Sequence, residues 1–209
     1  MSRAFQFCPK CGARVGTRQD TTSDDAKERA ACVAEGAVLG HHRYHAYRGD
    51  DARPALARVE VLCTQSNRGV AAAIARGVQR GEAVCLARDL AHTPGQDLVP
   101  AMLAERAKQV AKLAGARCTV LDVPAMERLG MGCVLAVGRG SVNPPRFIVL
   151  EKDATTTART TPHTIVIVGK GVTFDTGGVS IKPSEGMEKM KYDMAGGAAV
   201  LGAMRAIAK

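Results

Sequence analysis

Residues 164–197 read TIVIVGKGVTFDTGGVSIKPSEGMEKMKYDMAGG, and this stretch decides the fold that the sequence predicts. It begins with an almost wholly apolar run, Thr164 to Val168, which is typical of a strand buried on both faces. Glycine-rich sequence follows, and after it we expect a helix over Met194 to Ala208. In open α/β sheets, ligands bind beyond the carboxyl ends of strands, where glycine lets the backbone approach them closely. We therefore expect a functional site between Lys170 and Gly197.

Upstream of this stretch, predicted strands alternate with predicted helices. Apolar residues recur at helical spacing over Ala26–Tyr47, Asn67–Leu90, Pro100–Ala114 and, in a short helix, Met126–Leu129. Alternating or β-branched residues predict strands over Arg58–Thr64, Cys118–Val123 and Phe147–Leu150. Cys133–Val137 is expected to form an apolar turn. This order favours an α/β fold in which helices flank a mostly parallel sheet.

The composition is that of a globular protein and excludes several other classes. Hydrophobic residues make up 46% of the 209 residues and charged residues 23%. The apolar runs are far shorter than the ~20 residues that span a bilayer, and the N-terminus lacks the apolar segment of a signal peptide. Seven cysteines, most of them single and in apolar stretches, favour buried, reduced thiols. We expect a cytoplasmic protein without a membrane segment.

The net charge of +9 raises the question of an acidic partner. Lys and Arg are spread along the chain rather than gathered in one run, and only 3% of the residues are aromatic, which leaves few platforms for base stacking. We therefore do not expect nucleic-acid binding.

Asp175 and Asp193 are the candidate chemical groups in the glycine-rich stretch. Carboxylates that converge from a loop and a helix start suit Mn²⁺, Mg²⁺ or Zn²⁺. The pattern alone nevertheless favours a structural interpretation, in which Asp193 caps the last helix and Asp175 stabilises a turn. A Walker phosphate loop is excluded, because Lys170 is followed by Gly171 and no glycine stands at the required upstream position.

The sequence VGKGVTFDTGGVSIKPSEGMEKMKYDMAGGAAVLGAM resembles the signature region of the leucyl aminopeptidase family, cytosolic metallopeptidases that remove N-terminal residues. The resemblance continues through AVCLARDLAHTPGQDLVPAMLAERA and ERLGMGCVLAVGRGSVNPPRFIVLE, and so covers about residues 81–209. It implies a truncated catalytic domain over 81–209, preceded by a remnant N-terminal α/β domain and the start of a linker helix over 26–80. Residues 1–25 are expected to be poorly ordered.

The same resemblance implies roles for four residues. Lys170 and Asp193 would bind one of two divalent ions, Mn²⁺ or Zn²⁺, Asp175 would bridge both ions, and Lys182 would be catalytic. A lysine ligates only as a neutral amine, and adjacent dications lower its pKa, so we expect Lys170 to be unprotonated. Paired metals activate water and hold the free N-terminus of a peptide substrate, while Lys182 would donate to the oxyanion. The family also implies a homo-hexamer.

The chain departs from the family pattern in three ways. No later Asp-x-Glu pair of metal ligands, and no following arginine to hold a bicarbonate ion as general base, is present in the 209 residues, so we expect this chain alone to be inactive. His92 stands where the family usually has asparagine, and we assign it no function. Cys8 and Cys11, in CPKCG, form one knuckle of a zinc ribbon, which is half of a structural zinc site.

Two other functions compete with this interpretation. Asp175, Thr176 and Gly177 form the triplet that presents the catalytic carboxylate of an aspartic protease, but such an enzyme needs two aspartates that share a proton. The second alternative is a noncatalytic fragment or an interaction module that carries the zinc knuckle.

Overall fold

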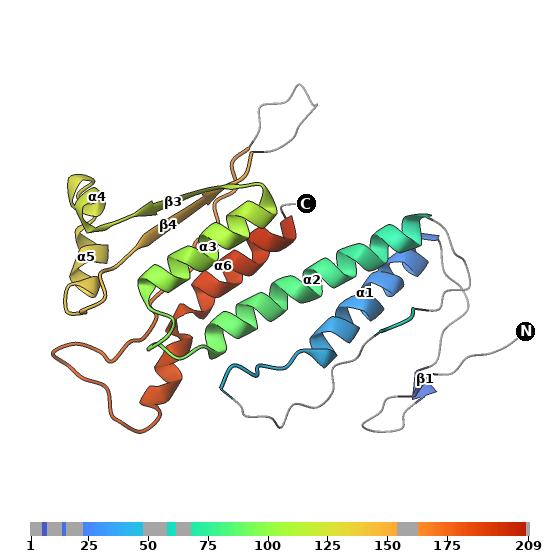
Figure 1. Cartoon of the computed structure of the whole chain (residues 1–209), viewed down its shortest axis with the longest axis horizontal. Coiled ribbons are helices and arrows are strands. Elements are labelled where there is room, and N and C mark those ends of the chain that lie inside the picture. The colour runs from blue at the N-terminus through green and yellow to red at the C-terminus, as the bar shows by residue number, and fades with distance from the viewer. Residues whose placement is uncertain are drawn as a thin grey trace, which may run out of the picture.

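The computed structural model describes residues 6–7, 14–15, 23–47, 58–61, 68–153 and 163–207. Figure 1 shows two groups of elements that meet along the longest helix. The helices are α1 (Ser23–His41), α2 (Arg68–His92), α3 (Pro100–Ala114), α4 (Val123–Arg128), α5 (Gly132–Gly138), the 3₁₀ helix η1 (Met187–Met194) and α6 (Ala195–Ile207). The strands are β1 (Gln6–Phe7), β2 (Arg14–Val15), β3 (Arg117–Leu121) and β4 (Phe147–Glu151).

Helices α1 and α2 lie side by side and run in the same direction (Figure 1). Ala31 of α1 faces Gly77 of α2, and Val38 faces Gly81. Small side chains make this close approach possible, since interaxial distance depends on the residues at the contact. A Cβ on Gly77 would overlap the carbonyl oxygen of Ala31 and lie 2.8 Å from its carbonyl carbon. Ala31 is itself fully buried. The two helices therefore touch through backbone.

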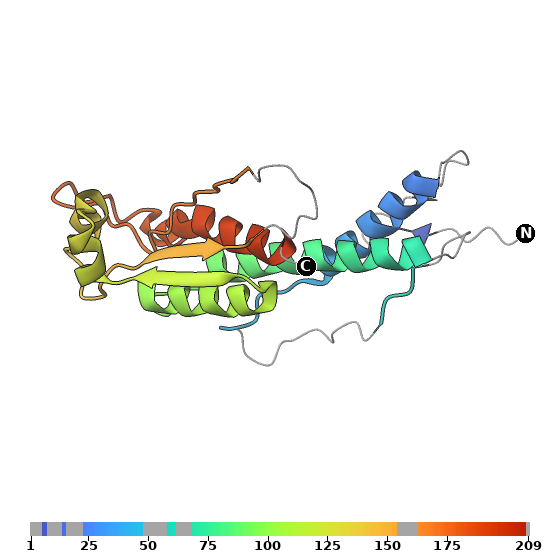
Figure 2. The same cartoon turned by 90° about the horizontal axis from the view of Figure 1, so that it is seen from above.

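The main hydrophobic core lies between α2, α3, η1 and α6. Its buried members are Leu90, Leu98, Leu103, Ala107, Val110, Met194, Ala198 and Leu201. Strands β3 and β4 add half-buried residues to this cluster from the side of α3, along which the pair runs (Figure 2). Met194 ends η1 inside the core, and α6 follows it directly. The core thus positions the end of the glycine-rich stretch.

The described strands form two antiparallel pairs. Arg117 pairs with Glu151 and Leu121 with Phe147 in the β3–β4 ladder, and Gln6 pairs with Val15 in the β1–β2 ladder. An α/β arrangement of a small sheet with flanking helices is confirmed. Parallel pairing, by contrast, does not occur among the described residues.

The strand predicted over Thr164–Val168 is wrong as a hydrogen-bonded element. The segment pairs with no described strand, and its apolar side chains are exposed by 85% at Ile165, 76% at Val166, 48% at Ile167 and 88% at Val168. A strand of this composition is stabilised by neighbouring strands and by layers that cover both faces. No described residue supplies these neighbours.

Three further sequence predictions can be compared with the structure. Pro100–Ala114 matches α3 at both ends, and the other predicted helices are present, but the one expected over Ala26–Tyr47 ends at His41, so the prediction of a helix is wrong for residues 42–47. The apolar turn predicted over Cys133–Val137 is wrong, because these residues belong to the helix α5. Of the strand predicted over Arg58–Thr64, residues 58–61 form no regular structure and residues 62–64 lie outside the described ranges.

The expectations about membrane-spanning segments and buried thiols can also be compared with the described residues. None of the helices in the described ranges has the length and apolar content needed to span a membrane. Four described cysteines are free thiols: Cys85 and Cys118 are half-buried, whereas Cys32 and Cys133 are exposed, so the prediction of buried thiols is wrong for the last two. Burial raises the pKa of the Cys85 and Cys118 thiols.

Candidate metal centre

Three glycines bring Lys170 against the start of α6. A Cβ on Gly169 would overlap the carbonyl oxygen of Gly196 and lie 2.8 Å from the amide nitrogen of Gly197. That amide nitrogen donates a 2.7 Å hydrogen bond to the carbonyl oxygen of Lys170. Only residues without a Cβ permit this backbone contact. Gly196 and Gly197 thus allow the start of α6 to pack tightly against the Lys170 backbone.

The contact places Lys170 beside Asp193, which directly precedes Met194, the last residue of η1. Lys170 Nζ lies 2.8 Å from Asp193 Oδ2. The Asp193 side chain is 20% exposed, and its Oδ2 atom is buried without a well-directed hydrogen bond from any described group. The lysine therefore neutralises the carboxylate at short range, while the lone pairs of Oδ2 remain without an ordinary donor.

A turn between Asp175 and Lys182 brings these two residues together. Lys182 donates its backbone N–H to Thr176 O at 3.0 Å, and an isolated bridge joins Gly177 to Ile181. Gly177 has a φ of 92°, a conformation that favours glycine. Its backbone N–H donates to Asp175 Oδ1 at 2.8 Å, and Lys182 Nζ donates to Asp175 Oδ2 at 2.8 Å. Both carboxylate oxygens are thus bound.

The charges of the two lysine–aspartate pairs also affect each other. The close contact with the Asp193 carboxylate raises the pKa of Lys170, and the charge of Asp175 adds to this increase. The Lys182 ammonium, followed by the Gly177 N–H, holds the pKa of Asp175 below its usual range, and the charge of Lys170 contributes to this decrease. The protein atoms alone therefore favour charged forms of Lys170 and Asp175.

These groups fit a divalent cation in part. A buried carboxylate oxygen without a directed donor, Asp193 Oδ2, is the kind of hard ligand that such ions bind. No set of three or more His, Cys, Asp or Glu side chains converges within the described ranges. A cation held by the described residues would thus take the Asp175 and Asp193 carboxylates and the Lys170 amine, which are fewer donors than two ions require.

The structure therefore joins the four residues singled out in the glycine-rich stretch into two ion pairs, Lys170 with Asp193 and Lys182 with Asp175. It also adds a residue that sequence reasoning missed, because Lys182 Nζ donates to Met190 Sδ at 3.0 Å. No sequence signal marks this methionine, since the contact depends on how the loop folds onto η1. Cys8 and Cys11 lie outside the described residues, although the β1–β2 pair brackets them.

The aspartic protease alternative finds no support in this geometry. A catalytic dyad needs a second carboxyl group that shares a proton with the first. Asp175 instead accepts hydrogen bonds from Gly177 N and Lys182 Nζ, and these occupy one carboxylate oxygen each. The described surroundings of Asp175 are thus those of an ionised carboxylate next to a cation.

Comparison with known proteins gives a consistent set of relatives. A probable cytosol aminopeptidase of Roseiflexus castenholzii is 46% identical over 184 residues, which cover 86% of this chain and 37% of the relative. A protein of the same description from Syntrophotalea carbinolica is 45% identical over 84% of this chain and 36% of the relative. The chain therefore spans little more than a third of the length of these relatives.

Two solved structures are similar in both sequence and fold. The bottromycin maturation enzyme BotP in complex with Mn is 42% identical, with a TM-score of 0.73, over 87% of this chain and 36% of that one. A variant of tomato leucine aminopeptidase is 31% identical, with a TM-score of 0.79, over 92% and 36% respectively. The sequence model of the cytosol aminopeptidase family, catalytic domain, matches residues 85–209. By this match, which includes Lys170, Asp175, Lys182 and Asp193, the chain belongs to the cytosol aminopeptidase family.

Proposed function

We propose that this chain supplies the lysine–aspartate part of a two-metal aminopeptidase site, in a protein that removes leucine-like N-terminal residues from peptides. The observation that carries the proposal is the buried Asp193 Oδ2 atom, which lies 2.8 Å from Lys170 and accepts no well-directed hydrogen bond from the described residues. The names of the relatives support the reaction, and the Mn complex of a similar structure supports a divalent ion.

In this proposal the residues of the two lysine–aspartate pairs have different roles. Lys170 and Asp193 would hold one ion, and Asp175 would be a ligand of both ions. When bound, Mn²⁺ or Zn²⁺ would supply an activated water and polarise the scissile carbonyl. Lys170 must then act as a neutral amine, although Asp193 raises its pKa in the protein alone. Binding of the ions should therefore release a proton from Lys170.

Lys182 is the proposed catalytic cation. Its ammonium group contacts Asp175 Oδ2 and Met190 Sδ. There it can donate to the negative oxygen that forms when water attacks the substrate carbonyl, a contact whose loss commonly slows a reaction ~10²- to 10³-fold. A bicarbonate ion would serve as general base in the complete site.

We further propose that the 209 residues bind metal but do not hydrolyse peptides on their own. The described donors, two carboxylates and one amine, do not complete two coordination shells. The working protein is proposed to be a cytoplasmic homo-oligomer, a hexamer as in the family. It would contain residues 26–80 as a remnant domain with the start of the linker helix, and residues 81–209 as part of the catalytic domain.

The first experiment measures Mn²⁺ binding by the paramagnetic resonance signal of the free aqua ion. The parent chain is expected to remove this signal, and Asp193→Asn to restore it, because the amide lacks the negative charge of the ligand. Asp153→Asn is the matched control, since Asp153 is an exposed aspartate that follows β4. Equal binding by the parent chain and Asp193→Asn would contradict the proposed metal role.

Activity is measured separately with leucyl-p-nitroanilide and Mn²⁺. The chain alone is expected to show no hydrolysis above background. Hydrolysis that disappears in Lys182→Met would show that the 209 residues are a complete catalyst, and the inactivity part of the proposal would then be wrong.

A noncatalytic module with a zinc knuckle is the second candidate, and one observation favours it. The antiparallel β1–β2 pair brackets residues 8–13, which include both cysteines of CPKCG. Zinc that copurifies with the chain and is lost in Cys8→Ser, with no Mn²⁺ binding in either protein, would favour this candidate over the aminopeptidase site.

A further inference from the structure

All three tyrosines of the chain lie in one aromatic cluster, which we define as Tyr44, Tyr47, His92 and Tyr192. The ring centroids are 6.0 Å apart between Tyr44 and Tyr47, 5.5 Å between Tyr44 and His92, and 5.9 Å between His92 and Tyr192. The rings come from three segments, the residues after α1, the end of α2 and η1. In a chain with only 3% aromatic residues, this cluster is a specific link between distant segments.

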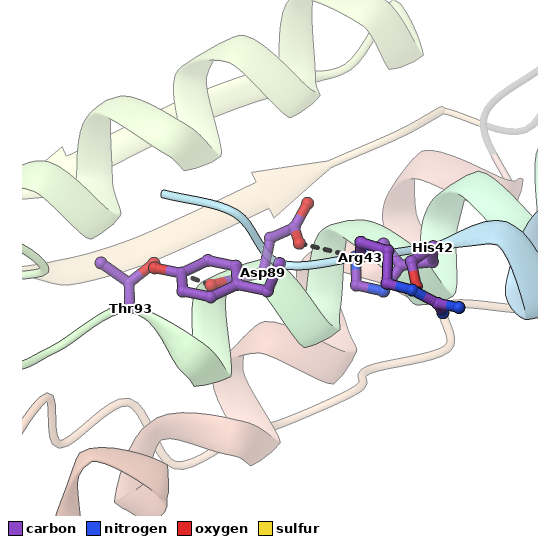
Figure 3. Close-up of polar contacts among 5 residues, drawn as sticks. His42, Arg43, Asp89 and Thr93 are labelled. Carbon is purple, nitrogen blue, oxygen red and sulfur yellow. Dashed lines mark hydrogen bonds and ion pairs between the residues drawn. The ribbon is translucent and has the colours of Figure 1, made fainter. Parts of the chain in front are cut away.

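The first side of the cluster is fastened to α2 by polar contacts. Tyr44 Oη donates to Thr93 Oγ1 at 3.1 Å, and Thr93 Oγ1 donates to Asp89 O at 2.7 Å. His42 Nε2 lies 2.7 Å from Asp89 Oδ1, and Figure 3 marks this contact with a dashed line. The hydroxyl of Tyr47 donates to Asp97 Oδ2. The segment after α1 thus holds Tyr44 against His92 at the end of α2.

The second side of the cluster faces η1. The His92 and Tyr192 rings meet edge to face at 79°, and His92 Nδ1 lies 3.4 Å from Tyr192 Oη. Lys191 Nζ donates to the carbonyl oxygen of His92 at 3.4 Å and lies 5.1 Å from the centre of the Tyr192 ring. Edge-to-face geometry is one that aromatic pairs prefer. His92 therefore contacts η1 through both its ring and its backbone.

Helix η1 needs such lateral contacts. It continues for eight residues as a 3₁₀ helix, although runs longer than three or four residues are uncommon because their hydrogen bonds have poor geometry. Met194 anchors its last residue in the core, and Tyr192 anchors the turn before it. Asp193 lies between these two anchors, so the direction of its carboxylate depends on both.

We propose that His92 is a positioning residue that fixes Asp193 through Tyr192, with the Tyr44 ring packed against the His92 ring. The inference rests on the proposed function, in which Asp193 binds a divalent ion. Loss of the ring leaves η1 with a smaller fraction of conformers in which Asp193 points at the ion.

The expected loss of Mn²⁺ affinity follows from the fraction of conformers in which Asp193 points at the ion. The apparent dissociation constant equals the intrinsic constant divided by the population of the competent state. If His92→Ala lowers this population to between about a third and a thirtieth, Mn²⁺ binding weakens roughly 3- to 30-fold. His92→Phe keeps the edge-to-face ring contact and loses only the 3.4 Å contact of Nδ1, so it should recover most of the affinity.

The test combines Mn²⁺ titration with amide hydrogen exchange of the metal-free chain. In His92→Ala we expect weaker Mn²⁺ binding and faster exchange over residues 187–194, with exchange in α3 unchanged. His92→Phe should restore both readouts. His45→Ala is the matched control, because His45 is an exposed histidine of the segment after α1 and lies outside the aromatic cluster. It should behave as the parent chain.

The outcomes separate this inference from the proposed function. Unchanged exchange over residues 187–194 in His92→Ala overturns the positioning role, whatever the metal affinity. Equal loss of Mn²⁺ binding in His92→Ala and His92→Phe also overturns it, because the ring would then not matter. If the parent chain and Asp193→Asn bind Mn²⁺ equally, the proposed function fails. The exchange data then still decide whether His92 orders η1.

Discussion

Replacement of Gly77 by alanine perturbs the backbone contact between α1 and α2 at its tightest point. The new Cβ would overlap Ala31 O and lie 2.8 Å and 2.9 Å from the carbonyl carbon and Cα of Ala31. All three are backbone atoms of a buried residue, so no side chain can rotate away and the helices must separate. Overpacking of this kind costs about 3 kcal/mol at the upper end of its usual range.

The gain in helix propensity offsets part of this cost. Alanine is about 1 kcal/mol more favourable than glycine in a helix interior, so Gly77→Ala should lower the free energy of unfolding by about 2 kcal/mol. In a chain of this size that corresponds to a melting temperature lower by about 4–8 °C. Gly36→Ala is the matched control, because a Cβ added to this α1 residue would have no atom within 4 Å of it.

The assay is urea unfolding followed by circular dichroism at 222 nm, with all three proteins fitted together. Gly36→Ala should be more stable than the parent by about 0.5–1 kcal/mol, since it gains propensity without a clash. If Gly77→Ala is as stable as the parent or more so, the close contact between α1 and α2 does not exist in solution, and the packing described for these helices is wrong.

Three other substitutions test separate features of the fold. Asp122→Ala removes the 3.0 Å N-cap bond from Ala125 N and should lower stability by about 1 kcal/mol in urea unfolding; an unchanged midpoint would contradict the cap. Met126→Ala empties a fully buried site and should cost about 2–5 kcal/mol by the same measurement, whereas a cost below that of Asp122→Ala would show that the site is not packed. Arg117→Gln tests the cross-strand pair with Glu151, whose pKa the Arg117 hydrogen bond and charge hold below its usual range. Because the folded pKa is lowered, the pair stabilises the fold above the ordinary glutamate pKa, and this contribution is lost as the pH falls through the lowered value. The stability difference between the parent and Arg117→Gln should therefore be present at pH 6 and shrink near pH 3, and a difference that is independent of pH would refute the pairing.

Local sequence signals predicted the helices well, and α3 shows why. Pro100 suits the first turn of a helix, where its missing N–H is not needed. Gly115 ends the helix with a φ of 58°, and its N–H bonds to Ala111 O and Lys112 O. Both ends of α3 are thus set by residues within the helix or next to it. Thr164–Val168 lacks such local control, because a strand needs partners elsewhere in the sequence, and its apolar composition alone did not produce a ladder.

The candidate site also has features that the sequence predicted and features that only the structure shows. Lys170, Asp175, Lys182 and Asp193 were predicted through a family resemblance whose motif lies in one short stretch. Their pairing as Lys170 with Asp193 and Lys182 with Asp175 is a three-dimensional result. His92 received no role from the sequence, because its contact with Tyr192 joins residues 100 positions apart. No local pattern marks such a contact.

The close approach of Gly169 to the start of α6 has a consequence for mutational scanning of this protein. A side chain at Gly169 would overlap Gly196 O and lie 2.5 Å from its carbonyl carbon, which would push the Lys170 backbone away from the start of α6. A scan scored on metal binding should therefore rank Gly169 beside the charged residues, although it contributes no ligand atom. Whether a substitution at Gly169 is tolerated depends on the space around its Cα. A loss of metal binding on substitution therefore does not identify a residue as a ligand.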